Sequence, residues 1–127
     1  MPERNRSLLP DDPPRAAYIH VPFCRHRCGY CNFALIADRD DLVESYLSAL
    51  RQELSWLDGT FEVDTLYFGG GTPSHLPPPL LEQLFQIVFE RFTLAAGFEF
   101  TMEANPADIT TDLVQVMNAY QVNRVSL

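Results

Sequence analysis

The chain has 127 residues, 46% hydrophobic and 20% charged, which is typical of one globular domain or part of one. Its net charge of −8 disfavours nucleic acid and anionic lipid as partners, since both attract basic surfaces. No apolar run approaches the roughly 20 residues of a membrane-spanning helix, and the first residues lack the apolar core of a secretory signal. We therefore expect a soluble, cytoplasmic protein without an integral membrane segment.

The first 15 residues differ from the rest of the chain. They include several prolines among charged residues and offer only Leu8 and Leu9 for burial. Such a segment cannot offset the conformational entropy that ordering would cost. We predict a flexible leader over residues 1–15 and a folded region over residues 16–127.

Apolar periodicity divides the folded region into alternating strands and helices. Short apolar runs predict strands over residues 16–21, 63–68, 98–103 and 124–127. Apolar residues at helical spacing predict helices between them, over residues 40–57, 77–92 and 110–120. Asp40 or Asp41 is suited to cap the first helix, and the prolines from Pro77 fit the first turn of the second.

The regular order of strand and helix predicts an α/β fold with right-handed crossovers and a parallel sheet. The sequence stops inside the last predicted strand, whereas a parallel strand is normally covered on both faces. An α/β barrel needs about 250 residues. We therefore expect a fragment in which the rest of the sheet is missing.

The three cysteines of the chain lie within eight residues, at Cys24, Cys28 and Cys31. An odd number of clustered thiols argues against a disulfide framework and indicates metal ligation in a reducing compartment. Three thiolates on one tight loop, with Gly29 to permit the turn, can hold three irons of a four-iron four-sulfur cluster. The fourth iron would then stay open to a small molecule.

Two other interpretations of the cysteines are open. Zinc would need a fourth ligand, which His20 or His26 could supply, although zinc ligands usually come from two separated pairs. Inert buried thiols fit less well, because Arg25 and Arg27 would favour the thiolate form.

Four strings resemble one family. The spacing C-x3-C-x2-C after a first strand is similar to the signature of the radical S-adenosylmethionine superfamily. Residues 18–24 (YIHVPFC), 68–74 (FGGGTPS), 100–106 (FTMEANP) and 123–127 (NRVSL) resemble the branch of that superfamily concerned with haem. The resemblance implies a partial, TIM-like (β/α)6 barrel, of which the sequence holds about the first three strand–helix units and the start of a fourth strand.

The resemblance also implies roles for particular residues. Cys24, Cys28 and Cys31 would ligate the cluster, and S-adenosylmethionine would chelate the open iron. The residues expected at that cofactor are Tyr18, Tyr30, Gly70, Gly71, Thr72 and Glu103. We assign no catalytic residue and no haem ligand, since His20, His26 and His75 are isolated in the sequence.

Each of these roles has a plainer alternative. The glycines could form an ordinary turn, although they also suit a backbone that must approach a ligand closely. Glu103 could be a solvated charge at a strand end rather than an acceptor for ribose hydroxyls. Tyr18 could be a buried strand aromatic, and Tyr30 could pack on adenine or simply shield the cluster.

Two types of protein in this branch differ just after the third cysteine. Coproporphyrinogen oxidases of the HemN type carry a fourth cysteine there, whereas HemW-type haem chaperones continue with Cys-Asn-Phe, as this chain does at Asn32 and Phe33. The resemblance therefore favours a chaperone that binds haem and delivers it to an acceptor protein, with an electron donor for the cluster. An oxidase that decarboxylates coproporphyrinogen and an inactive truncated fragment are the alternatives.

Overall fold

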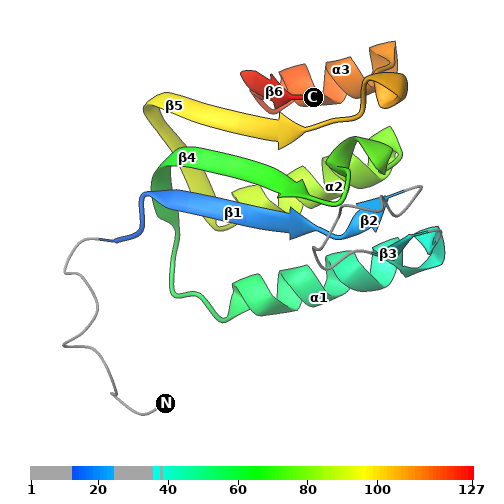
Figure 1. Cartoon of the computed structure of the whole chain (residues 1–127). Coiled ribbons are helices and arrows are strands. Elements are labelled where there is room, and N and C mark those ends of the chain that lie inside the picture. The colour runs from blue at the N-terminus through cyan, green and yellow to red at the C-terminus, as the bar shows by residue number, and fades with distance from the viewer. Residues whose placement is uncertain (1–12, 25–35, 38) are drawn as a thin grey trace.

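A four-stranded parallel sheet in the order β1-β4-β5-β6 forms the centre of the protein (Figure 1). The computed structural model describes residues 13–24, 36–37 and 39–127, so most of the predicted leader and of the cysteine segment lies outside the described residues. The strands of the sheet are β1 (Ala16–Val21), β4 (Phe61–Gly70), β5 (Phe92–Glu103) and β6 (Arg124–Ser126). This confirms the predicted α/β fold with a parallel sheet.

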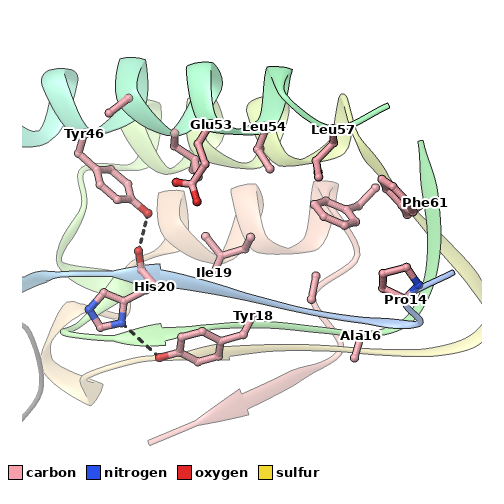
Figure 2. A pocket seen from close by; sticks show the side chains of 14 residues that line it. Pro14, Ala16, Tyr18, Ile19, His20, Tyr46, Glu53, Leu54, Leu57 and Phe61 are labelled. Atoms are coloured by element: carbon pink, nitrogen blue, oxygen red, sulfur yellow. Dashed lines mark hydrogen bonds between the residues drawn. The ribbon is translucent and has the colours of Figure 1, made fainter. Parts of the chain in front are cut away.

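In the described part of the chain, helices cover one side of this sheet (Figure 1). They are α1 (Val43–Ser55), α2 (Pro78–Phe89) and α3 (Thr111–Ala119). Side chains alternate along each strand, so that Ile19 of β1, Phe68 of β4 and Phe100 of β5 are buried beneath the helices. The residues between them face the opposite side, and Figure 2 shows Tyr18 and His20 pointing away from α1.

Parallel pairing brings the carboxyl ends of the strands to one edge of the sheet. The register pairs Val21 with Gly70, Phe68 with Met102, and Glu103 with Ser126. We call this edge the rim. The connections that leave the rim include the 3-10 turns η2 (Asp40–Leu42), η3 (Pro73–His75) and η4 (Pro106–Asp108).

The predicted cap of the first helix is wrong. Neither α1 nor the η2 turn before it has a side-chain cap. Asp40 instead bonds His75 at 2.8 Å, and Asp41 forms two hydrogen bonds with Arg39. These hydrogen-bond partners compete with the backbone amides for the two carboxylates. The third helix, in contrast, begins as expected, because the side chain of Thr110 accepts a hydrogen bond from the amide of Leu113.

The boundary between the second helix and the third strand also differs from the prediction. The helix α2 ends at Phe89, and Phe92 begins β5 instead of closing the helix. The strand therefore starts six residues before the predicted Phe98, and its register against β4 shifts after Leu94. Gly97 has a φ of 75° in this irregular stretch, which disturbs the alternation that marks a strand in a sequence.

A second, two-stranded sheet was not predicted. It pairs β2 (Phe23–Cys24) with β3 (Ile36–Ala37), which flank the segment that carries Cys28 and Cys31. Strands of two residues are too short to show a period. Within the described residues, no helix has both the length and the hydropathy needed to cross a membrane.

Candidate functional site

The predicted site residues that the structure describes lie at or near the rim. The strand β1 leads to Cys24, β4 ends in the glycine stretch, and β5 ends at Glu103. Parallel α/β folds place their binding sites at this edge, because the strands end there and the loops are free to vary. The fold thus brings together residues that are far apart in the sequence.

Cys24 is buried in β2, directly after the first strand. Its neighbour Phe23 accepts a 2.7 Å hydrogen bond from the backbone amide of Thr72, so the start of the cysteine segment is bonded to the glycine stretch. Cys28, Cys31 and Tyr30 lie outside the described residues. Of the three predicted metal ligands, the structure therefore places one.

Two of the glycines are required by the chain itself. A Cβ atom on Gly71 would lie 2.5 Å from the carbonyl oxygen of Phe23, and one on Gly70 would lie 2.6 Å from the imidazole of His20. Gly70 also has a φ of 112°, a conformation that other residues rarely adopt. A ligand is thus not needed to explain these glycines, because the end of β4 already approaches His20 of β1 and Phe23 of β2 closely.

Glu103 is held by two donors from β4. Its Oε2 accepts a 2.7 Å hydrogen bond from the hydroxyl of Tyr67, and its Oε1 accepts a 3.0 Å bond from the amide of Gly70. The hydrogen bond to Glu103 is the main reason why the pKa of Tyr67 is raised above 10. Glu103 is therefore an oriented carboxylate rather than a freely solvated charge. Each of its oxygens keeps a further lone pair for a ligand.

Tyr18 lies on the open face of the sheet, beside this carboxylate. Its ring stacks on that of Tyr67, with the ring centroids 5.7 Å apart, and the residue is 57% exposed. The alternative that Tyr18 is a buried strand aromatic is therefore wrong. Partial burial, followed by the charge of Glu103, raises the pKa of its hydroxyl. Tyr18 thus presents an aromatic surface and a polar tip next to the rim.

A polar hollow of about 350 Å³ opens at the rim beside Glu103. It is lined by Gly71, Thr72, Glu103, Ala104, Asn105, Pro106, Ser126 and Leu127. A carboxylate with unused acceptor capacity fits a ligand that carries hydroxyl groups, such as the ribose of a nucleoside. The carboxylate of Glu103 and the volume of the hollow are thus compatible with the adenosyl part of S-adenosylmethionine.

A larger groove of about 480 Å³ lies between β1 and α1 (Figure 2). Its lining is mainly apolar, with Leu54, Leu57 and Phe61 above the strand edge. At one end the hydroxyl of Tyr46 donates a 2.6 Å hydrogen bond to the carbonyl of His20. Neither Glu103 nor the glycine stretch contributes to this groove, so we place the candidate site at the rim.

Sequence reasoning missed three residues of this region. Tyr67 orients Glu103, Ser126 lines the hollow, and Ser74 is a buried hydroxyl between two rim loops. The period of two in residues 65–69 signals that Tyr67 points away from the buried Leu66 and Phe68, but its partner is 36 residues away. A local pattern cannot show such a contact.

The fold is that of an α/β protein, and the rim carries a polar hollow at the ends of the parallel strands. The model of the radical SAM superfamily matches residues 18–127, which include each of the predicted site residues. The chain therefore belongs to the radical SAM superfamily. Membership implies a four-iron four-sulfur cluster and S-adenosylmethionine as cofactors.

Relatives with different names match this chain to a similar degree. The chain is 39% identical over 117 residues to the heme chaperone HemW of Lactococcus lactis, with 90% of this chain covered. It is 36% identical over 126 residues to the oxygen-independent coproporphyrinogen III oxidase of Bradyrhizobium diazoefficiens, with 95% covered. The two identities are too similar to decide between the names.

The fold matches a solved structure of coproporphyrinogen III oxidase (HemN) from Escherichia coli, a radical SAM enzyme. The TM-score is 0.75 at 32% identity, over 85% of this chain and 26% of the other. The chain spans 30% and 28% of the length of the two relatives named above. The parallel sheet with its helices thus corresponds to a part of a radical SAM fold, as the sequence predicted.

Proposed function

We propose that this chain is the part of a haem chaperone that binds a four-iron four-sulfur cluster and S-adenosylmethionine. Cys24, Cys28 and Cys31 would hold the cluster, in keeping with the thiolate chemistry of such sites. A cluster held by these thiolates would supply electron-transfer chemistry toward the sulfonium of S-adenosylmethionine. The other residues of the site would bind and orient S-adenosylmethionine.

The rim supports this assignment through Glu103 and its surroundings. The carboxylate lies at a polar hollow, where it can accept hydrogen bonds from ribose hydroxyls. Gly70, Gly71 and Thr72 lie next to it and would contact the methionyl part. Tyr18 would lie against the cofactor from the open face of the sheet, and Tyr30 would cover the adenine or the cluster.

The choice of a chaperone over an oxidase rests on one observation, the sequence Asn32-Phe33 after the third cysteine. A phenylalanine has no thiol with which to replace the fourth cysteine that oxidases of this branch carry. We therefore propose haem as the transported ligand and a haem-accepting protein as the partner. Decarboxylation of coproporphyrinogen is the alternative, and the structural match to an oxidase is the observation in its favour.

The cluster is tested by anaerobic reconstitution with iron and sulfide. We expect the absorption of a four-iron cluster, and a change in the electron paramagnetic resonance of the reduced cluster when S-adenosylmethionine is added. Replacing any one of the three cysteines by serine should abolish both signals, while Ser48→Ala on the exposed face of α1 serves as the control. Binding of a single zinc ion instead of iron would overturn the proposal.

The choice between the two activities needs a second experiment. The complete protein of which this chain is a part is reconstituted and titrated with haem, and a separate sample is incubated anaerobically with coproporphyrinogen, S-adenosylmethionine and a reductant. We expect the complete protein to bind haem stoichiometrically, to transfer it to an apo-protein acceptor and to form no protoporphyrinogen. Protoporphyrinogen formed at enzymatic rates would identify an oxidase instead.

A further inference from the structure

The four residues Thr72 to His75 hydrogen-bond to three other segments of the rim. They follow the glycine stretch and include the η3 turn, whose Pro73 and Ser74 are buried. The motif FGGGTPS reaches as far as Ser74, but nothing in the sequence indicates which other segments Ser74 and His75 contact. The contacts of Thr72 to His75 nevertheless reach the entrance of the cysteine segment, its exit, and the loop after Glu103.

Both ends of the cysteine segment are bonded to this stretch. At the entrance, the amide of Thr72 donates a 2.7 Å hydrogen bond to the carbonyl of Phe23, next to Cys24. At the exit, Nε2 of His75 lies 2.8 Å from Oδ1 of Asp40. Because a carboxylate only accepts, Nε2 must donate in this pair. The His75 side chain is only 12% exposed, so its ring is held in place by packing.

The third bond leads to the strand end that carries Glu103. The hydroxyl of Ser74 accepts a 2.8 Å hydrogen bond from the amide of Asn105 and donates a 2.9 Å bond to Oδ2 of Asp108. Ser74 is only 4% exposed, and both bonds span more than 30 residues of sequence. Asn105 is two residues after Glu103, so this bond fixes the chain just beyond the carboxylate.

We propose that Thr72 to His75 form a clasp that sets the positions of Phe23 and Asp40, on either side of the cysteine segment, relative to Glu103, with Ser74 and His75 as positioning residues. Neither side chain needs to touch a cofactor. They act by holding two loops whose residues would bind the two halves of one ligand, the cluster-bound methionyl group and the ribose. The inference rests on the proposed cofactors and adds the residues that align their sites.

The geometry predicts a specific effect on affinity. A ligand that spans two sites binds tightly only when both are held at the right separation, since misplacement costs binding energy at one of them. Breaking the clasp should therefore weaken S-adenosylmethionine binding to the cluster-loaded protein. It should leave the capacity to take up iron unchanged, because the cysteines themselves are untouched.

The test compares two neighbouring aspartates of the same turn. Asp40 bonds His75 and belongs to the clasp, whereas the exposed Asp41 bonds Arg39, which lies outside the clasp. We expect Asp40→Ala to weaken S-adenosylmethionine binding by about two- to fivefold, in line with one exposed charged hydrogen bond. Asp41→Ala should leave the affinity unchanged. Isothermal titration of the anaerobically reconstituted protein measures both.

Variants of His75 and Ser74 distinguish a misaligned binding site from a protein that has lost its fold. His75→Leu keeps the buried bulk and removes the donor, whereas His75→Gln keeps an amide donor and should restore most of the affinity. Ser74→Ala should have a larger effect than Asp40→Ala, of about five- to tenfold, and Ser74→Thr should retain the hydroxyl. Iron content and melting temperature are measured for each, and Asp40→Ala should change neither.

The outcomes distinguish the clasp from the proposed function. Normal iron uptake and S-adenosylmethionine binding, with equal affinities for Asp40→Ala, Asp41→Ala and the unaltered protein, would overturn the clasp alone. Failure of the unaltered protein to take up a four-iron cluster would overturn the proposed function, and the clasp with it. A loss of affinity in Asp40→Ala and His75→Leu that His75→Gln reverses would support the proposal.

Discussion

The hydroxyl of Tyr67 donates a 2.7 Å hydrogen bond to Oε2 of Glu103, across two neighbouring strands of the sheet. The amide of Gly70 bonds the other oxygen at 3.0 Å, so both donors come from β4 while the carboxylate comes from the end of β5. The orientation of Glu103 is thus set by the protein before a ligand arrives. Such preorganisation lowers the cost of ordering the side chain on binding.

The first prediction concerns the hydrogen bond from Tyr67 to Glu103. Tyr67→Phe should weaken S-adenosylmethionine binding by about three- to tenfold, which corresponds to the roughly 1 kcal/mol of a typical hydrogen bond. Calorimetric titration of the reconstituted protein measures it. The matched control is Tyr120→Phe, which removes another tyrosine–glutamate bond, to Glu82 at 3.3 Å and away from the rim. Equal affinities for the two variants would show that Tyr67 does not orient the site.

The second prediction compares the effect on stability of substitutions at two glycines. Gly71→Ala should destabilise the fold by about 1–3 kcal/mol, the range for overpacking, because the new Cβ would meet the carbonyl of Phe23, which is a backbone atom that cannot rotate away. Gly59 also has a left-handed φ, of 76°, but has nothing within 4 Å of such a Cβ. Gly59→Asn should therefore cost less than Gly71→Ala, since asparagine adopts this conformation more readily than most other residues. Urea denaturation measures both, and equal costs would contradict the steric explanation.

The third prediction concerns pH. The guanidinium of Arg15 forms two 2.8 Å hydrogen bonds with Asp64 and lowers the pKa of that carboxyl below 3.8. A carboxyl with a lowered folded-state pKa stabilises the fold above its unfolded-state pKa, and this contribution is lost as the pH falls through the folded-state value. Asp64→Asn should therefore reduce stability at neutral pH and lose that difference in acid.

The measurement is the free energy of unfolding in urea from pH 7 down to roughly pH 2, because the contribution of the ion pair is lost as the carboxyl becomes protonated in the folded protein. Both side chains are exposed, so the effect is small, and a double-mutant cycle with Arg15→Gln isolates it. A difference between the two proteins that is constant over this range would show that the ion pair is not its source.

The fourth prediction concerns the core under the helices. Phe85 of α2 lies between Phe68 and Phe100, with ring centroids 5.1 and 5.4 Å away. Phe85→Ala should lower the free energy of unfolding by about 3–5 kcal/mol, the range for a large cavity in a packed core. Trp56→Ala should change it by less than about 0.5 kcal/mol, because the indole is 73% exposed. A comparable loss in both variants would contradict the described core.

Local patterns in the sequence were sufficient for the elements and the architecture. Apolar periodicity located the four strands of the large sheet and the three helices, because the burial of one face imposes a period on neighbouring residues. It failed where that period was disturbed or too short. The early start of β5 was hidden by the irregular stretch around Gly97, and the two-residue strands on either side of the cysteine segment carry no period.

The sequence by itself determined the order of the strands and helices, the cysteine spacing and the motif strings that indicate the family, since all of these are properties of adjacent residues. Only the tertiary structure decided which distant groups meet. The bond from Tyr67 to Glu103, the contact of Gly71 with Phe23 and the bonds of Ser74 join segments that are brought together by parallel pairing of the strands. Such partners depend on three-dimensional register, which no local pattern encodes.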